Sequence, residues 1–284
     1  MIFVSTGGFN TITAIDAIKA LSNYKITSFE LSGGIYSSKL SSNLKKLDNN
    51  YSFIVHNYFP PPENPFVLNL ASLDDEIFLR TVNHIKDSIS LASNLNSQYY
   101  SFHAGFLVDP KVSELGKTVQ KRKLYNKKES LQRFLDALKS LSKFAAEKNV
   151  ELLIENNVLN KSNLDKFGKN PLLMVDFDDT EYILNNLDDN VHLLIDVAHL
   201  KVSANTLKFN AYEYLKVFKD HTKGYHLSDN DGLSDSNSQF LNDSWFWPHI
   251  RKDLNYYSVE VYNPNPEILL SQLQLARKFI FDQD

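Results

Sequence analysis

The feature that most constrains the fold is a regular alternation of short apolar runs with longer segments of helical periodicity. The amphipathic segments, which predict helices, lie near residues 11–22, 73–96, 129–148, 178–187, 210–220 and 265–280. The apolar runs, which predict strands, are IFVS (2–5), ITSFEL (26–31), SFIVH (52–56), QYYSFH (98–103), VELLIE (150–155), VHLLID (191–196), GYHLS (224–228) and YSVEVY (257–262). Alternation of this kind indicates a parallel sheet covered by helices.

Eight such units in 284 residues predict an α/β fold of the closed (βα)8 TIM-barrel type, as a single domain over residues 1–284. A barrel of this kind needs about 250 residues, which leaves room for modest loop extensions. An open doubly wound sheet is the alternative, but the segment STGGFN after the first run is not the Gly-rich phosphate turn of that fold. Two long loops, 57–72 and 104–128, would lie at the C-terminal face, where the active sites of barrels form.

Composition narrows the classes of partner. The formal charge of −4 provides no general attraction to nucleic acid or anionic lipid, and the absence of cysteine leaves only nitrogen and oxygen as metal ligands. No apolar stretch approaches ~18 residues, so a membrane span is not expected. The first residues do not resemble a signal peptide, and we expect a cytoplasmic protein. Assembly into a homo-oligomer is left open.

Polar residues fall at one end of strand after strand. Since the carboxyl ends of barrel strands converge on one cavity, residues that are distant in sequence are expected to meet there. Four of the eight histidines are in this set. Its members are Glu30, His56, His103, Glu155, Asp196, His199, His226, Asp229 and Glu260.

Glu155 and Asp196 each end a run of buried apolar residues. An unpaired carboxylate in such a position costs several kcal/mol, and the neighbouring strand ends offer no arginine to offset it. Together with His226 and Glu260 they predict a divalent-metal site. Ligands rich in oxygen with one imidazole suit Mn²⁺ or Zn²⁺, and also Mg²⁺ or Co²⁺.

Other residues have two interpretations each. His56 is either a ligand or a partner of a backbone carbonyl, and Glu30 is either a salt-bridge partner at the rim or a contact to substrate hydroxyls. The basic run 117–128 is a solvated loop or a clamp for an anion. Trp245 and Trp247 either cover a substrate or close the barrel rim.

At these residues the chain resembles the xylose isomerase-like TIM barrel superfamily, which includes sugar phosphate isomerases and epimerases, dehydroshikimate dehydratases and the endonuclease IV nucleases. The resemblance covers nearly the whole sequence. It rests on FVLNLAS (66–72), SFHAGF (101–106), LLIENN (152–157), LLIDVAH (193–199) and YHLSDNDG (225–232).

The resemblance implies roles for individual residues. Glu155, Asp196, His226 and Glu260 match the metal ligands shared by the epimerases and nucleases, and His56 and His103 with Glu155 match a second metal site of the nucleases. A third nuclease site would use His199 and Asp235, but Asn237 stands where that pattern has histidine. Asparagine is a poor ligand for transition metals, so the third site is not expected here.

These observations favour an isomerase or epimerase acting on a sugar, a sugar phosphate or a related polyhydroxy carbonyl compound through an enediolate. Glu155 and Glu260 would be its catalytic acid–base pair, with His199 and Glu30 orienting hydroxyls. A dehydratase acting on a cyclic hydroxy-ketone, a phosphodiesterase acting at apurinic sites and a non-catalytic sugar-binding barrel are the alternatives. A small carbohydrate-like substrate is expected rather than DNA, because the loop SDNDGLSDSNSQFLNDS (228–244) is acidic.

Overall fold

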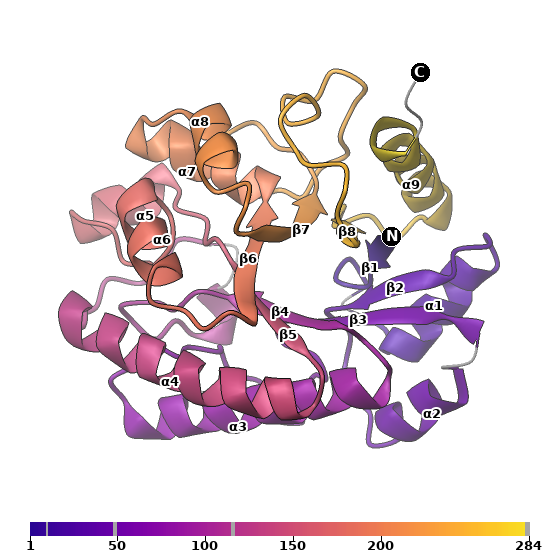
Figure 1. Ribbon diagram of the computed structural model, residues 1–284, viewed down its shortest axis with the longest axis horizontal. Helices are drawn as coiled ribbons and strands as arrows, with labels where there is room; N and C mark the ends of the chain where they lie inside the picture. The colour runs from indigo at the N-terminus through magenta and orange to yellow at the C-terminus, as the bar shows by residue number, and fades with distance from the viewer. Residues whose placement is uncertain (10, 48–49, 115–116, 282–284) are drawn as a thin grey trace.

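Eight parallel strands close into a barrel in sequence order, which confirms the predicted (βα)8 fold (Figure 1). The computed structural model describes residues 1–9, 11–47, 50–114 and 117–281, so residues 115–116 of the predicted loop and 282–284 of the predicted domain lie outside it. The strands are β1 (Ile2–Ser5), β2 (Ser28–Leu31), β3 (Ser52–His56), β4 (Tyr99–His103), β5 (Glu151–Glu155), β6 (Val191–Asp196), β7 (Thr222–Leu227) and β8 (Tyr256–Val259).

Helices surround the barrel (Figure 1). Most begin at a side chain that accepts hydrogen bonds from the first turn; Asp74 caps α3, Asn126 caps α4 and Asn265 caps α9 in this way. The helices are α1 (Ala14–Ser22), α2 (Leu40–Leu47), α3 (Asp75–Asn94), α4 (Lys127–Glu147), α5 (Lys161–Phe167), α6 (Phe177–Leu184), α7 (Val197–Leu207), α8 (Ala211–Val217) and α9 (Pro266–Ile280), with a 3-10 turn at Val112–Glu114.

The structure adds three helices that were not predicted and moves the end of the last strand. Helix α7 was not predicted, because it is buried around most of its circumference and has little amphipathic periodicity. Helices α2 and α5 were also missed; both are short. The last strand ends at Val259 rather than at residue 262, so Glu260 follows the strand instead of lying within it.

The interior of the barrel is filled by side chains that point inward from alternate strand positions. They form a separate apolar cluster of Phe3, Ile54, Tyr99, Leu153, Leu194 and Tyr256. Ile54, Leu153 and Leu194 each lie two residues before a polar strand end, so those polar ends also point into the barrel. A larger apolar core lies between the sheet and the helices.

Strand β1 closes the barrel by pairing with both β2 and β8, so the first and last strands are neighbours (Figure 1). Helix α9 packs against β1 beside this seam. Among the described helices, none combines the length and the apolar character needed to cross a membrane.

Gly224 on β7 lies where a larger residue would collide with the barrel interior. A Cβ atom at this position would approach Leu194 Cδ1 and Tyr256 Cδ1 to 2.8 Å. Overpacking of this kind typically costs about 1–3 kcal/mol. We therefore expect Gly224→Ala to lower the free energy of unfolding by about 1–3 kcal/mol, measured by urea denaturation.

The control is Lys143→Ala on the exposed face of α4, which should change that free energy by less than about 0.5 kcal/mol. A Gly224→Ala variant as stable as this control would show that the interior layer can rearrange freely.

Candidate metal centre

The predicted polar strand ends converge at the C-terminal mouth of the barrel. His56, His103, Glu155 and Asp196 are the last residues of β3, β4, β5 and β6. His226 is the fifth residue of β7, and Glu260 follows β8 directly. Parallel pairing with matched register places Asp196 opposite His226 and His103 opposite Glu155. Adjacent strands therefore present these side chains at one level.

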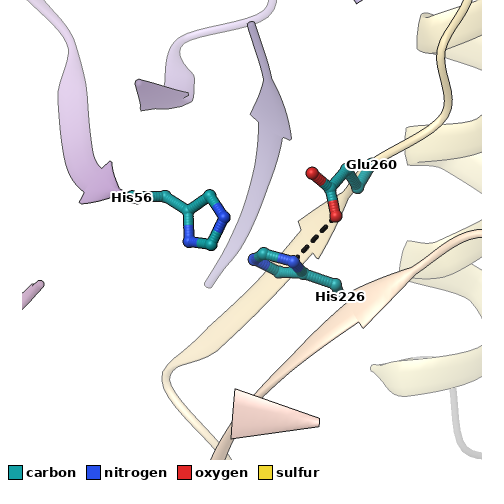
Figure 2. A group of neighbouring side chains, drawn as sticks. All are labelled: His56, His226 and Glu260. Carbon is teal, nitrogen blue, oxygen red and sulfur yellow. Dashed lines mark ion pairs between the residues drawn. The ribbon is translucent and has the colours of Figure 1, made fainter. Parts of the chain in front are cut away.

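The first metal-capable group consists of Glu155, Asp196, His226 and Glu260. One ligand atom from each lies within 4.8 Å of all the others, and all four residues are buried. The Nδ1 atom of His226 is 2.8 Å from Glu260 Oε2 and 3.4 Å from Glu155 Oε1. Figure 2 shows His226 lying between Glu260 and the imidazole of His56, whose ring centroid is 4.6 Å from that of His226.

A second group, made of His56, His103 and Glu155, shares Glu155 with the first. The Oε2 atom of Glu155 lies 3.4 Å from His56 Nε2 and 3.3 Å from His103 Nδ1. Its other oxygen faces His226, so the carboxylate of Glu155 stands between the two groups. This arrangement allows one carboxylate to contact two ions.

The buried polar atoms of the site fit a cation. Within the described part of the chain, both oxygens of Glu155, Asp196 Oδ2, His226 Nδ1 and His103 Nδ1 are buried and make no hydrogen bond, although His226 Nδ1 and the oxygens of Glu155 lie at ion-pair distances from their neighbours. Buried polar groups are nearly always satisfied in folded proteins, and carboxylate oxygens with imidazole nitrogens are ligands for divalent metals. The residues present therefore fit a divalent ion at this position.

The pKa values of the three carboxyl groups in the first group diverge. Burial alone would raise the pKa of Glu155, but the nearby charges of His103 and His226 outweigh it and hold this pKa well below its ordinary value. Burial, reinforced by the charges of Glu260 and Glu155, raises the pKa of Asp196 to about 8. Burial also raises the pKa of Glu260. The histidines therefore favour the ionised form of Glu155, whereas burial favours the protonated form of Asp196 and Glu260.

Glu30 corrects one prediction. It is fully buried rather than at the rim, and its Oε2 atom lies 2.9 Å from His226 Nε2, on the side of the ring away from Glu155. The hydroxyl of Tyr256 donates to the same oxygen at 2.6 Å. The charge of His226 and its hydrogen bond overcome the effect of burial and lower the pKa of Glu30 to about 2. Glu30 thus accepts a hydrogen bond from His226, a candidate metal ligand, on the side of the ring that faces away from Glu155.

His199 lies beside the first group and also faces the following loop. Its Nδ1 atom is 3.3 Å from Glu155 Oε1, and its Nε2 atom is 3.1 Å from Asp235 Oδ2. Asn237 is buried, and its side-chain amide donates to the backbone carbonyl of Glu260. Asn237 therefore fixes the loop against the end of β8.

The remaining predicted residues lie in structural contacts. Asp229 bonds to Lys201 at 2.6 Å and accepts from Ser244 at 2.7 Å, so its carboxylate anchors the loop after β7. Trp247 is buried, donates to a backbone carbonyl and stacks on Phe279 of α9, so it packs the rim of the barrel.

Part of the basic run is held in ion pairs. Arg122 pairs with Glu114 at 2.8 Å, and Lys127 pairs with Asp179 at 2.6 Å. Both side chains therefore pair with carboxylates of the protein itself. These ion pairs favour a structural loop over a clamp for an anion.

Three supporting residues were missed by the sequence analysis. Asn156 follows the candidate ligand Glu155, and its side chain bonds to the backbone N–H and C=O of Asp196. Ser101 and Tyr256 lie below the site, hydrogen-bonded to each other. The repeated asparagines after VELLIE were a visible signal for Asn156, whereas Tyr256 resembles any other core aromatic in sequence.

Solved structures with this fold include several sugar epimerases. A D-tagatose 3-epimerase-like protein superposes with a TM-score of 0.70 at 16% identity, covering 98% of this chain and 96% of its own. The D-psicose 3-epimerase from Clostridium cellulolyticum H10 gives a TM-score of 0.67 at 13% identity, with coverage of 98% and 97%. An IOLI protein with a bound zinc atom gives 0.68 at 14% identity, with coverage of 98% and 97%. The chain thus has the fold of sugar epimerases.

Curated relatives match over part of the sequence. The telomere-binding protein OPG077 of Vaccinia virus (strain Ankara) is 32% identical over 164 residues, which is 54% of this chain and 50% of the relative. The Monkeypox virus protein of the same name is 31% identical over an equal length. The chain spans about half the length of the curated relatives it matches.

A family profile provides the broadest match. The profile described as "Xylose isomerase-like TIM barrel" aligns with residues 8–278, which include every strand from β2 to β8 and all six residues of the two groups described above. The chain therefore belongs to the xylose isomerase-like TIM barrel family.

Proposed function

We propose that this protein is a divalent-metal-dependent isomerase or epimerase acting on a sugar, a sugar phosphate or a related polyhydroxy carbonyl compound. The observation that carries the proposal is the buried group of Glu155, Asp196, His226 and Glu260, with ligand atoms within 4.8 Å of one another. Mn²⁺ and Zn²⁺ suit these ligands best, and Mg²⁺ and Co²⁺ also fit. The epimerase neighbours support a carbohydrate-like substrate.

The ion, when bound, would polarise a substrate carbonyl and an adjacent hydroxyl and so stabilise an enediolate. Proton movement at the substrate carbon falls to Glu155 and Glu260. The lowered pKa of Glu155 keeps this carboxylate ionised, as a base must be before it takes up a proton, and burial raises the pKa of Glu260, which suits a group that holds a proton for return. The hydroxyl of Tyr262 lies 3.5 Å from Glu260 Oε1 and is available to orient a substrate oxygen, since 49% of Tyr262 is exposed.

A lyase of the dehydroshikimate dehydratase type would begin with the same proton abstraction. It differs only in the fate of the enediolate, which would expel a β-hydroxyl group instead of being reprotonated. Including a cyclic hydroxy-ketone in the substrate panel separates these two outcomes.

A metal-dependent phosphodiesterase acting at apurinic sites is the second candidate, because a specific observation favours it. The second group, His56, His103 and Glu155, would allow two ions to act together on a phosphodiester. The curated relatives are named telomere-binding proteins, which fits contact with nucleic acid. Asn237 and the formal charge of −4 stand against it.

Asp196→Asn tests the metal site through stability. Between pH 3.8 and about 8, the unfolded chain ionises Asp196 while the metal-free folded protein keeps it protonated, so this residue lowers folding stability as the pH rises. We expect the metal-free variant to lose that part of the pH slope and to be at least as stable as the wild type at pH 7. We also expect it to lose most of the stabilisation that saturating Mn²⁺ or Zn²⁺ gives the wild type, about 2.7 kcal/mol at 100 times Kd.

Thermal and urea unfolding with and without metal measure both effects. Asp136→Asn on the exposed face of α4 is the matched control and should behave as the wild type does. Equal metal stabilisation in Asp196→Asn and the control would place the ion elsewhere.

Glu260→Gln tests the proton shuttle. The amide keeps the shape of the side chain and an oxygen that can contact a metal, but it cannot take up or release a proton. We expect exchange of the substrate C–H with deuterated solvent to fall by at least about 100-fold in this variant. The measurement is NMR on ketoses, sugar phosphates and sugar acids with Mn²⁺ or Zn²⁺ present.

Glu267→Gln, in the exposed first turn of α9, serves as control and should exchange at the wild-type rate. Undiminished exchange in Glu260→Gln would remove Glu260 from the mechanism, and a wild type inert toward the whole panel would defeat the sugar proposal.

Incubation with duplex DNA carrying one abasic site separates the two candidates. Because the proposal assigns a small substrate, we expect no cleavage above a metal-only blank at catalytic enzyme concentrations with Mn²⁺ or Zn²⁺. Cleavage that disappears in Glu155→Ala would replace the isomerase proposal with the phosphodiesterase.

A further inference from the structure

Below the candidate metal centre, a run of buried hydrogen bonds connects His226 of the first group with His56 of the second. From His226 Nε2 it passes through Glu30 Oε2, at 2.9 Å, to the Tyr256 hydroxyl, at 2.6 Å. From Tyr256 it continues to Ser101 Oγ at 3.0 Å, and Ser101 lies 2.9 Å from His56 Nδ1. All five side chains are buried. We call these five residues the buried network.

The direction of each hydrogen bond in the buried network follows from counting protons. The carboxylate of Glu30 can only accept, and Tyr256 donates its single hydroxyl proton to it. The Tyr256 oxygen must then accept from Ser101. Since the Ser101 proton is used in that bond, the Ser101 oxygen must accept from His56, whose Nδ1 atom therefore carries a proton.

The same carboxylate fixes the other end of the buried network. His226 donates from Nε2 to Glu30. Each imidazole thus carries a proton on the nitrogen that faces the network, so in its neutral, metal-binding form the other nitrogen presents a lone pair. Those nitrogens face Glu155: His56 Nε2 lies 3.4 Å from Oε2, and His226 Nδ1 lies 3.4 Å from Oε1. A lone pair in that direction is what a metal ligand requires.

We propose that Glu30 is a positioning residue for both metal groups, acting directly on His226 and through Tyr256 and Ser101 on His56. One buried carboxylate would then set the tautomers of two histidines on different strands. The inference rests on the metal binding of the proposed function but not on its substrate. It assigns Tyr256 and Ser101 a role that their position in the apolar interior alone does not suggest.

The test is a Co²⁺ titration of the full chain, followed by visible absorption and equilibrium dialysis. Hyperfine-shifted imidazole N–H signals in the proton NMR spectrum, assigned with His56→Ala and His226→Ala, identify each bound ion. Glu30→Met should lower the affinity for both Co²⁺ ions by about tenfold or more. This is the usual effect of losing a residue that hydrogen-bonds to a metal ligand. Ser101→Ala should weaken binding of only the ion held by His56. Tyr256→Phe should weaken binding of that ion more than binding of the ion held by His226, because the Tyr256 hydroxyl also lies 3.3 Å from His226 Nε2.

Two readouts separate positioning from general damage to the fold. The double variant Tyr256→Phe/Ser101→Ala should bind the His56 ion no more weakly than either single variant, because both changes interrupt the same line of hydrogen bonds. In Ser101→Ala the His56 N–H signal should exchange faster with solvent while the His226 signal is unchanged, because among the described residues the Ser101 hydroxyl bonds only to His56 and Tyr256. Tyr257→Phe is the matched control, since Tyr257 is buried on the same strand and its hydroxyl bonds to Arg251 and Leu254 instead.

Equal effects of Tyr256→Phe and Tyr257→Phe, additive losses in the double variant, or a wild type that binds a single Co²⁺ would each overturn the inference. A wild type that binds two Co²⁺ ions with the expected pattern of variants, yet acts on no sugar, would defeat the proposed substrate and leave the buried network intact.

Discussion

The structure of the barrel mouth depends on one electrostatic constraint, the burial of several carboxyl groups around Glu155. Four imidazoles surround this carboxylate. His103, His226 and His199 lower the pKa of Glu155, and His226 and His56 lower that of Glu30. The imidazoles do not compensate Asp196 and Glu260, whose pKa values stay raised by burial. In the metal-free protein both groups are therefore shifted towards the protonated, neutral form. A divalent ion beside them would favour their ionised form, which is why metal binding is central to the proposed function.

The fold meets this constraint by separating an apolar layer from a polar one inside the barrel. Alternation along each strand places apolar residues such as Leu153 and Leu194 in the lower layer and their polar neighbours two positions on in the upper one. Tyr256 belongs to both layers, since its ring packs in the apolar cluster and its hydroxyl contacts Glu30 and Ser101. The aromatic ring therefore carries a hydrogen-bonding group up to the base of the site.

Much of this arrangement could be predicted from the sequence, because strand period and strand ends are local properties. The barrel, its strand order and the convergence of Glu155, Asp196, His226 and Glu260 follow from eight apolar runs with polar ends. Other features depend on tertiary contacts that leave no periodic signal. Helix α7 is buried on most sides, Glu30 turns away from the rim to meet His226, and Asp229 is drawn to Lys201. Tyr256 has a role only through partners on distant strands.

The position of the last strand has a consequence for folding. Strand β8 pairs with β7, and Glu260 at its end joins a group whose other members come from β5, β6 and β7. These four strands are contiguous in the sheet, so the group needs the last four strands to be paired but does not need the pairing of β8 with β1. An ion held there would add its binding free energy only to forms in which β8 has joined β7. An intermediate without β8 would keep three of the four ligands and lose Glu260, so metal occupancy would report on the docking of the last strand.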